Sequence, residues 1–135
     1  MNGLSGPFTL VARILLAAIF ISAGFSKITG FDGTVGYIAA YGLPMANSVA
    51  ILTILLEIVA GIALLVGFQA RIAAFLLGGF SILAALIFHA FWSVPADQVY
   101  MQQLMFMKNL SIAGGLFMVT ALGAGAWSLD NKQPN

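Results

Sequence analysis

The sequence predicts an all-α integral membrane protein: a four-helix bundle with a short interfacial helix after its first span. Of the 135 residues, 61% are hydrophobic and 7% are charged, and the mean hydropathy is +1.06. A soluble domain carries about 25% charged residues, so this composition indicates a protein that lies in a lipid bilayer. The apolar runs do not alternate in the way that membrane β-strands do. We therefore expect helices, in a single domain that covers residues 1–135.

Four apolar segments are long enough to cross a bilayer, because a helix needs about 20 residues to do so. They cover about residues 8–26, 46–68, 71–92 and 104–125. The first segment shares some features with a secretory signal, but Arg13 is its one basic residue and apolar residues precede it. We expect it to be retained as the first span. An even number of spans places both termini on the same side of the membrane.

A short helix is predicted between the first two spans. Residues 33–41 place apolar and aromatic side chains at near-helical spacing, and Gly42 and Pro44 would end the helix. Tyr37 and Tyr41 are four residues apart, so both rings would lie on one face at the level of the lipid headgroups. We expect these rings to anchor the helix in the interface rather than to contact a ligand.

Basic residues predict the orientation, because Lys and Arg are retained on the cytoplasmic side. The side that holds the termini carries Arg13, Arg71 and Lys132, and the other side carries Lys27, Asp32 and Asp97. We therefore expect both termini in the cytoplasm, Arg13 and Arg71 in the cytoplasmic headgroup layer, and a disordered polar tail over residues 128–135. The net charge of +1 provides no basic patch, so nucleic acid is not an expected partner.

Several kinds of redox chemistry require residues that this sequence lacks. The chain contains no cysteine, which excludes disulfides, iron–sulfur ligation and covalent haem attachment. A single histidine cannot supply both axial ligands of a bis-histidine haem, and together with Glu57 it makes a poor metal site. We expect no metal, no covalently bound cofactor and no self-contained catalytic centre.

Glu57 is the only carboxylate inside the four apolar segments. A charge at membrane depth costs roughly 2.5 to 3.5 kcal/mol on insertion scales, so this residue requires a partner or a function. Each span also carries a stripe of small residues of the kind that marks helix contacts, and each stripe includes one ionisable residue. These residues are Lys27, Glu57, His89 and Lys108. With the stripes turned inward, they and Asn109 would converge in the outer half of the bundle; Lys108 leans outward, so its alternative neighbours are solvent and the first loop.

Two interpretations of this polar cluster remain open. In the first, Glu57 neutralises Lys27 or Lys108, Asn109 supplies hydrogen bonds, and the buried ion pair fixes the packing of the helices. In the second, the cluster lines a pocket for a polar head such as a quinone carbonyl or a small anion. Lysine and His89 would then be the donors and Glu57 the proton acceptor.

Several short motifs stand in an order and at a spacing that can be compared with known membrane proteins. They are Ala23-Gly24-Phe25-Ser26-Lys27, Gly30-Phe31-Asp32-Gly33-Thr34-Val35, Tyr41-Gly42-Leu43-Pro44, Glu57 with Gly61, Gly67-Phe68 before Arg71, the segment from His89 to Trp92, Lys108-Asn109-Leu110-Ser111-Ile112-Ala113-Gly114, and Ser128-Leu129-Asp130. Over about residues 11–130 the chain resembles the DoxX family of small four-helix bacterial membrane proteins. The resemblance implies that the characteristic polar positions are Lys27, Glu57, Arg71, His89, Lys108 and Asn109.

The resemblance also implies a role in membrane redox chemistry. The family takes its name from a subunit of a thiosulfate:quinone oxidoreductase, and some relatives join membrane-associated redox complexes. We expect a multi-pass protein of the bacterial inner membrane that acts as an accessory or non-haem subunit of a quinone-linked system. Quinone is then the expected ligand, and the expected partners besides the lipid bilayer are redox-complex subunits or further copies of the chain. The alternatives are a component of a transporter for a small solute or proton, and a purely structural assembly factor.

Overall fold

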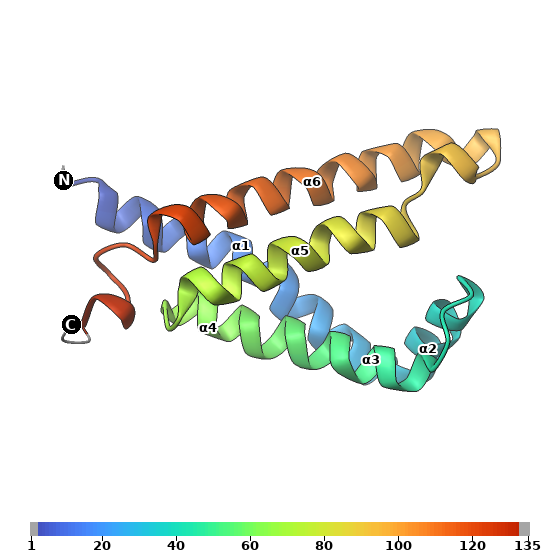
Figure 1. Cartoon of the computed structure of the whole chain (residues 1–135), viewed down its shortest axis with the longest axis horizontal. Helices are drawn as coiled ribbons and strands as arrows, with labels where there is room; N and C mark the ends of the chain where they lie inside the picture. Colours follow the sequence, from blue (N-terminus) through green and yellow to red (C-terminus); the bar gives the residue numbers. More distant parts are fainter. Residues whose placement is uncertain (1–2, 133–135) are drawn as a thin grey trace.

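The computed structural model describes residues 3–132, and every regular element in this range is helical. The α-helices are α1 (Ser5–Thr29), α2 (Phe31–Ala40), α3 (Ala46–Leu55), α4 (Gly61–Val66), α5 (Ala70–Phe88) and α6 (Val99–Leu122). A π-helical turn, η1 (Leu56–Ala60), joins α3 to α4, and short 3₁₀ turns occur at η2 (Phe91–Ser93), η3 (Ala96–Gln98) and η4 (Asp130–Lys132). Figure 1 shows the elements in order.

Four helical segments are long and apolar enough to cross a membrane, which confirms the predicted fold class. They are Ser5–Thr29, Ala46–Val66, Ala70–Ser93 and Ala96–Leu122. The last of them begins before residue 104, where apolar residues become dense, because the polar residues Gln102 and Gln103 continue the helix instead of ending it. The short helix expected at residues 33–41 is present as α2.

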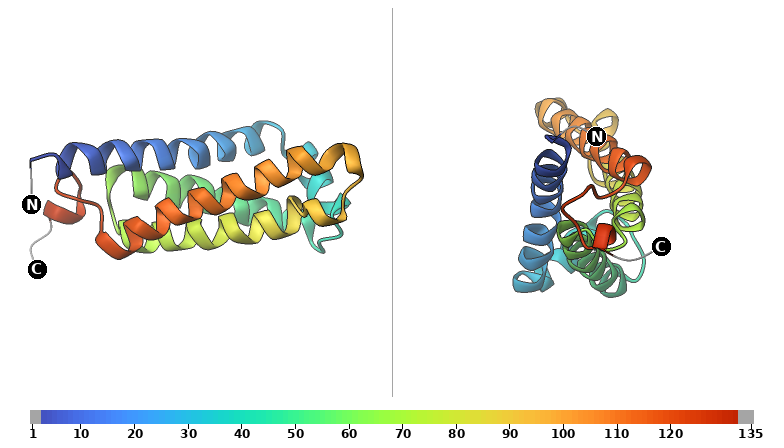
Figure 2. Two further views of the ribbon diagram at one scale, coloured as in Figure 1. Left: turned by 90° about the horizontal axis from the view of Figure 1, so that it is seen from above. Right: turned by 90° about the vertical axis from the view of Figure 1, so that its left-hand side faces the viewer.

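The four spans run antiparallel, and both termini lie at one end of the bundle (Figures 1 and 2). We call this the terminal end, and we call the opposite end, where α2 lies, the α2 end. Helix α1 packs against α3, η1 and α4, whereas α6 packs along α5 and contacts α1 only sparsely. The bundle therefore consists of two units, α1–α4 and α5–α6, which diverge toward the α2 end (Figure 1).

The packed core lies in the half of the bundle nearer the terminal end. Its fully buried members come from all four spans and include Ala17, Leu64, Leu77 and Leu116. Small residues bring helices close together there, as expected where the hydrophobic effect cannot drive packing within lipid. A Cβ atom at Gly61 would lie only 2.9 Å from Cγ1 of Ile21, so the second span can approach α1 this closely only with glycine at this position.

Arg13 is buried inside the protein at the terminal end, with only 1% of its surface exposed, whereas the sequence predicted a headgroup-layer residue. Its guanidinium donates hydrogen bonds to the backbone carbonyls of Leu64, Leu65, Ala124 and Trp127. Leu64 and Leu65 lie in the last turn of α4, where carbonyls run out of helical N–H partners. Arg13 is therefore held by the end of one helix and by the segment that follows α6. Arg71 is exposed, and it donates to the carbonyls of Thr120 and Ala121 at the end of α6.

Residues 128–132 are ordered and packed on the bundle, so the prediction of a disordered tail was wrong for this part. The remaining residues of that predicted tail, 133–135, lie outside the described range. The carboxylate of Asp130 accepts hydrogen bonds from the backbone N–H groups of Gln69, at 2.7 Å, and Ala70, at 2.9 Å. These groups begin α5, where the helix has unpaired N–H donors and favours a negative charge. The tail is thus the N-terminal cap of a helix distant in the sequence.

Candidate functional site

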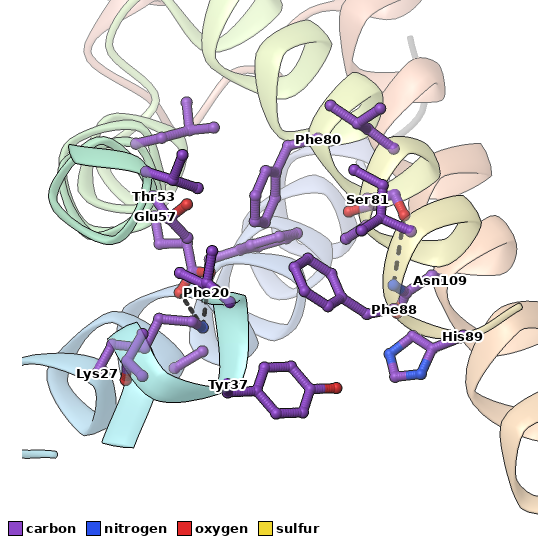
Figure 3. A pocket seen from close by; sticks show the side chains of 18 of the residues that line it. Phe20, Lys27, Tyr37, Thr53, Glu57, Phe80, Ser81, Phe88, His89 and Asn109 are labelled. Carbon is purple, nitrogen blue, oxygen red and sulfur yellow. Dashed lines mark hydrogen bonds and ion pairs between the residues drawn. The ribbon is translucent and has the colours of Figure 1, made fainter. Parts of the chain in front are cut away.

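A cavity of about 550 Å³ lies between the two units of the bundle at the α2 end. Its walls come from the end of α1, from α2, α3 and η1 on one side, and from α5 and α6 on the other. The volume falls within the roughly 300–1,000 Å³ that is usual for small-molecule sites, and the lining is mostly apolar with a few polar groups. Figure 3 shows the cavity from close by.

All five residues of the predicted polar cluster line this cavity: Lys27, Glu57, His89, Lys108 and Asn109. Only two of them contact each other directly. The Nζ atom of Lys27 lies 2.9 Å from Oε1 and 3.2 Å from Oε2 of Glu57. Within residues 3–132 this is the only ion pair. Of the two partners that the sequence offered for Glu57, the structure pairs it with Lys27 and not with Lys108.

The two members of the ion pair differ in their exposure. Glu57 is 2% exposed, whereas the side chain of Lys27 is 30% exposed. Gly24 explains how the two can meet, because a Cβ atom there would lie 2.5 Å from Cγ1 of Ile58. The absence of a side chain at Gly24 lets α1 approach the turn that carries Glu57, and Lys27 follows one helical turn later on the same face.

Glu57 lies in the π-helical turn η1, a feature that the sequence analysis missed. The apolar run around it contains no proline, and Gly61 comes only after the turn, so no residue type signals the irregularity. A π-helical turn adds one residue to a helix and is frequent at functional sites. It changes the direction in which the residues before it point relative to those after it. The turn therefore contributes to where the carboxylate of Glu57 is directed.

The other polar residues of the cavity lie on α5 and α6. Nδ2 of Asn109 donates a hydrogen bond to the carbonyl of Ser81 at 3.3 Å, which ties α6 to α5. Nδ1 of His89 lies 2.8 Å from Oε1 of Gln102. Lys108 is exposed, and its Nζ lies 3.4 Å from the sulfur of Met105. His89 and Lys108 therefore line the same cavity as Glu57, but neither forms a hydrogen bond or ion pair with it.

An aromatic group attaches α2 to the end of α5 beside the cavity. The ring of Tyr37 stacks on Phe88 with centroids 5.4 Å apart, and Tyr41 meets the same ring edge-on at 5.0 Å. The hydroxyl of Tyr37 donates to that of Tyr41 at 3.5 Å. Burial, followed by this hydrogen bond and the neighbouring hydroxyl, raises the pKa of Tyr37 to about 12. Tyr37 also lines the cavity, so its role is not confined to the interface.

These features define a small polytopic membrane protein whose spans enclose a ligand-sized cavity with an ion pair in its wall. The chain belongs to the DoxX family, whose model matches residues 8–90, as the sequence motifs predicted. It is 42% identical over 130 residues to the inner membrane protein YqjF of Escherichia coli K12, covering 96% of this chain and 95% of the relative. It is 41% identical over 123 residues to the inner membrane protein YphA of the same organism, covering 91% and 88%.

A more distant relative is eukaryotic. The chain is 29% identical over 128 residues to the surfeit locus protein 4 homolog of Schizosaccharomyces pombe, covering 93% of this chain but only 37% of that protein. No solved structure is significantly similar to the chain.

Proposed function

We propose that the chain is an accessory subunit of a membrane redox system, and that its cavity binds a lipid-soluble molecule with a quinone-like head. Its two bacterial relatives are named inner membrane proteins, which supports the same location for this chain. The excess of basic residues at the terminal end supports a cytoplasmic position for both termini.

The observation that carries this proposal is the ion pair of Lys27 and Glu57 in the wall of the cavity. A buried pair gives little net stability, and apolar residues of similar volume can replace such pairs without loss. A pair whose only role is packing would therefore be expected inside the packed core, away from open volume. This pair instead borders about 550 Å³ of space with a mostly apolar lining. A polar head would find there a donor in Lys27 and an acceptor in Glu57, while its apolar part remains in a lipid-like environment.

The composition of the chain supports the accessory role. The sequence has no cysteine and one histidine, so it offers no thiol pair and no set of iron–sulfur ligands. Electrons that reach a quinone in this cavity would have to come from a partner protein that carries its own cofactor. The protein would hold the quinone head, and the partner would supply the electrons.

A binding experiment tests the proposal. Quinone-free lipid nanodiscs with and without the protein are equilibrated with a short-chain ubiquinone, and the retained quinone is measured by absorbance after extraction. The same measurement is made anaerobically with the reduced ubiquinol. We expect saturable retention by the protein, with the affinity for ubiquinone reduced about tenfold or more in Lys27→Met and the affinity for ubiquinol reduced about tenfold in Glu57→Gln, because a carbonyl accepts from the ammonium group and a quinol hydroxyl donates to the carboxylate. Asp97→Asn and Lys132→Met make the same chemical changes at exposed positions outside the cavity and should bind as the wild type does.

The outcome that contradicts the proposal is specific. If both variants fold normally, as judged by gel filtration and thermal unfolding, and Lys27→Met retains ubiquinone and Glu57→Gln retains ubiquinol as the wild type does, then the ion pair is not a contact of the ligand. Glu57→Gln is the more informative variant, because the amide keeps the shape of the side chain and one acceptor oxygen.

A further inference from the structure

The polar groups of the cavity lie on two opposite walls. The first wall carries Lys27 and Glu57, from α1 and η1, and the second carries His89, from the end of α5, and Asn109, from α6. Lys108 of α6 also lines the cavity, but it is exposed and its Nζ contacts the sulfur of Met105. Figure 3 shows the two sets on opposite sides of the cavity, with aromatic side chains, including that of Phe88, between them. A ligand that fills the space would meet polar groups at both of its ends and rings along its faces.

The first wall offers a hydrogen-bond donor and an acceptor. The ammonium group of Lys27 has three N–H bonds, and the carboxylate of Glu57 has about four acceptor positions on its two oxygens. The contacts at 2.9 Å and 3.2 Å between the two side chains use only part of this capacity. A ligand oxygen at this wall can therefore accept from Lys27 as a carbonyl or donate to Glu57 as a hydroxyl.

The second wall offers the same two functions through Asn109 and His89. Asn109 uses one N–H of its amide on the carbonyl of Ser81, which leaves its second N–H as a donor. Oε1 of Gln102 can only accept, so Nδ1 of His89 carries the proton of the 2.8 Å contact. In a neutral imidazole the other nitrogen, Nε2, is then an acceptor. This wall thus pairs a donor, Asn109, with an acceptor, His89.

We infer that the cavity recognises a planar ring with one oxygen at each of two opposite ends, and that it binds both the dicarbonyl and the dihydroxy form. This inference rests on the proposed function, because it assigns the chemistry of the ligand at the same site. In the dicarbonyl form the two oxygens accept from Lys27 and Asn109. In the dihydroxy form they donate to Glu57 and His89. A para-quinone and its quinol have this arrangement, and the inference concerns binding alone.

Matched ring compounds test the two-ended recognition. Binding to nanodisc-embedded protein is measured for para-naphthoquinone and for alpha-tetralone, which has one carbonyl, with empty nanodiscs subtracted. The same comparison is made anaerobically for para-naphthohydroquinone and alpha-naphthol, which has one hydroxyl. We expect the compound with two oxygens to bind about tenfold more tightly in each pair, which is the value of one further well-placed hydrogen bond.

Two variants of the second wall should act on different forms of the ligand. Asn109→Leu removes the amide donor and should weaken the binding of para-naphthoquinone about tenfold. The affinity for alpha-tetralone should change by less than about twofold. His89→Leu removes the acceptor and should weaken the binding of the hydroquinone about tenfold. The binding of the quinone should weaken by less than about twofold. His89→Leu also leaves the bond between Asn109 and Ser81 intact, so it serves if Asn109→Leu does not fold. Gln103→Leu removes an exposed amide of α6 outside the cavity and should change nothing.

The results separate the two proposals. If compounds with one and two oxygens bind equally, and the second-wall variants bind as the wild type does, two-ended recognition is refuted while a one-ended quinone site stands. If no ring compound binds at all, both proposals fail together.

Discussion

Replacing Lys27 with methionine should destabilise the protein more than replacing Glu57 with methionine. Each substitution leaves one charged side chain without its partner. The two side chains differ in how easily the remaining charge can reach water. Glu57 is 2% exposed, whereas the side chain of Lys27 is 30% exposed. A long lysine side chain can turn its ammonium toward water or headgroups. Because Glu57 is the more deeply buried of the two, Lys27→Met should lower the free energy of unfolding more than Glu57→Met does.

The expected magnitudes follow from the same geometry. Breaking a buried ion pair by removing one partner costs about 3–5 kcal/mol when the remaining charge stays buried. We expect Lys27→Met to lie near the lower limit, about 3 kcal/mol, because the pair is partly screened at the lysine. Glu57→Met should cost about 1–2 kcal/mol, because the remaining lysine can relocate. The double variant, which combines Lys27→Met with Glu57→Met, should have a free energy of unfolding within about 1 kcal/mol of the wild type, because a buried pair can be exchanged for apolar residues.

The assay is the free energy of unfolding in mixed micelles of a mild detergent and dodecyl sulfate. The fluorescence of the two tryptophans, Trp92 and Trp127, reports the transition, and neither lines the cavity. Lys132→Met is the control for loss of a positive charge at an exposed position. The same double variant should not bind quinone, which separates the contribution of the pair to folding from its contribution to the ligand site.

Two results would refute this reasoning. If Lys27→Met costs no more than Glu57→Met, the exposure of the two side chains does not govern the energetics of the pair. If the double variant costs as much as the sum of the single variants, the two residues are not coupled and the contact at 2.9 Å contributes nothing to the stability of the bundle.

Two further predictions concern the ends of the bundle. Asp130→Ala removes the cap of α5 and should lower the free energy of unfolding by about 0.5–2 kcal/mol, and an equal loss in the exposed control Asp97→Ala would argue against capping. Tyr37, whose pKa is raised to about 12, should ionise in a late step of a titration of phenolate absorbance. Because the folded pKa is raised above the ordinary value of about 10, the associated stability is present below about pH 10 and is lost as the pH rises through about 12. Tyr37→Phe should remove the late step, and an unchanged titration curve would contradict the assignment.

The parts of the fold that depend on local sequence could be predicted. The length of the apolar runs identified the spans, and Gly42 with Pro44 marked the end of α2. The stripes of small residues placed Lys27 and Glu57 on facing surfaces, because glycine at close helix contacts is a local signal. The only carboxylate in the apolar runs, Glu57, was sufficient to locate the wall of the cavity that carries the ion pair.

The parts that depend on distant contacts could not be predicted. Arg13 is buried because Ala124 and Trp127, more than a hundred residues later, provide carbonyls for it, and a single basic residue near the start of a span gives no sign of this. Which of its two expected placements Lys108 takes also depends on such contacts: it is exposed, because α6 packs along α5 and contacts α1 only sparsely.

The π-helical turn at Leu56–Ala60 has a consequence for how this helix can change over evolutionary time. One residue of an α-helix corresponds to a rotation of about 100°. A π-helical turn holds one residue more than an α-helical turn does, so deleting that residue would restore a uniform helix and keep the faces before and after it in nearly the same relation. Losing the turn without losing a residue would instead rotate all preceding side chains against all following ones by about this angle. The helix would still cross the bilayer, but the residues before the turn would present a different face to α1.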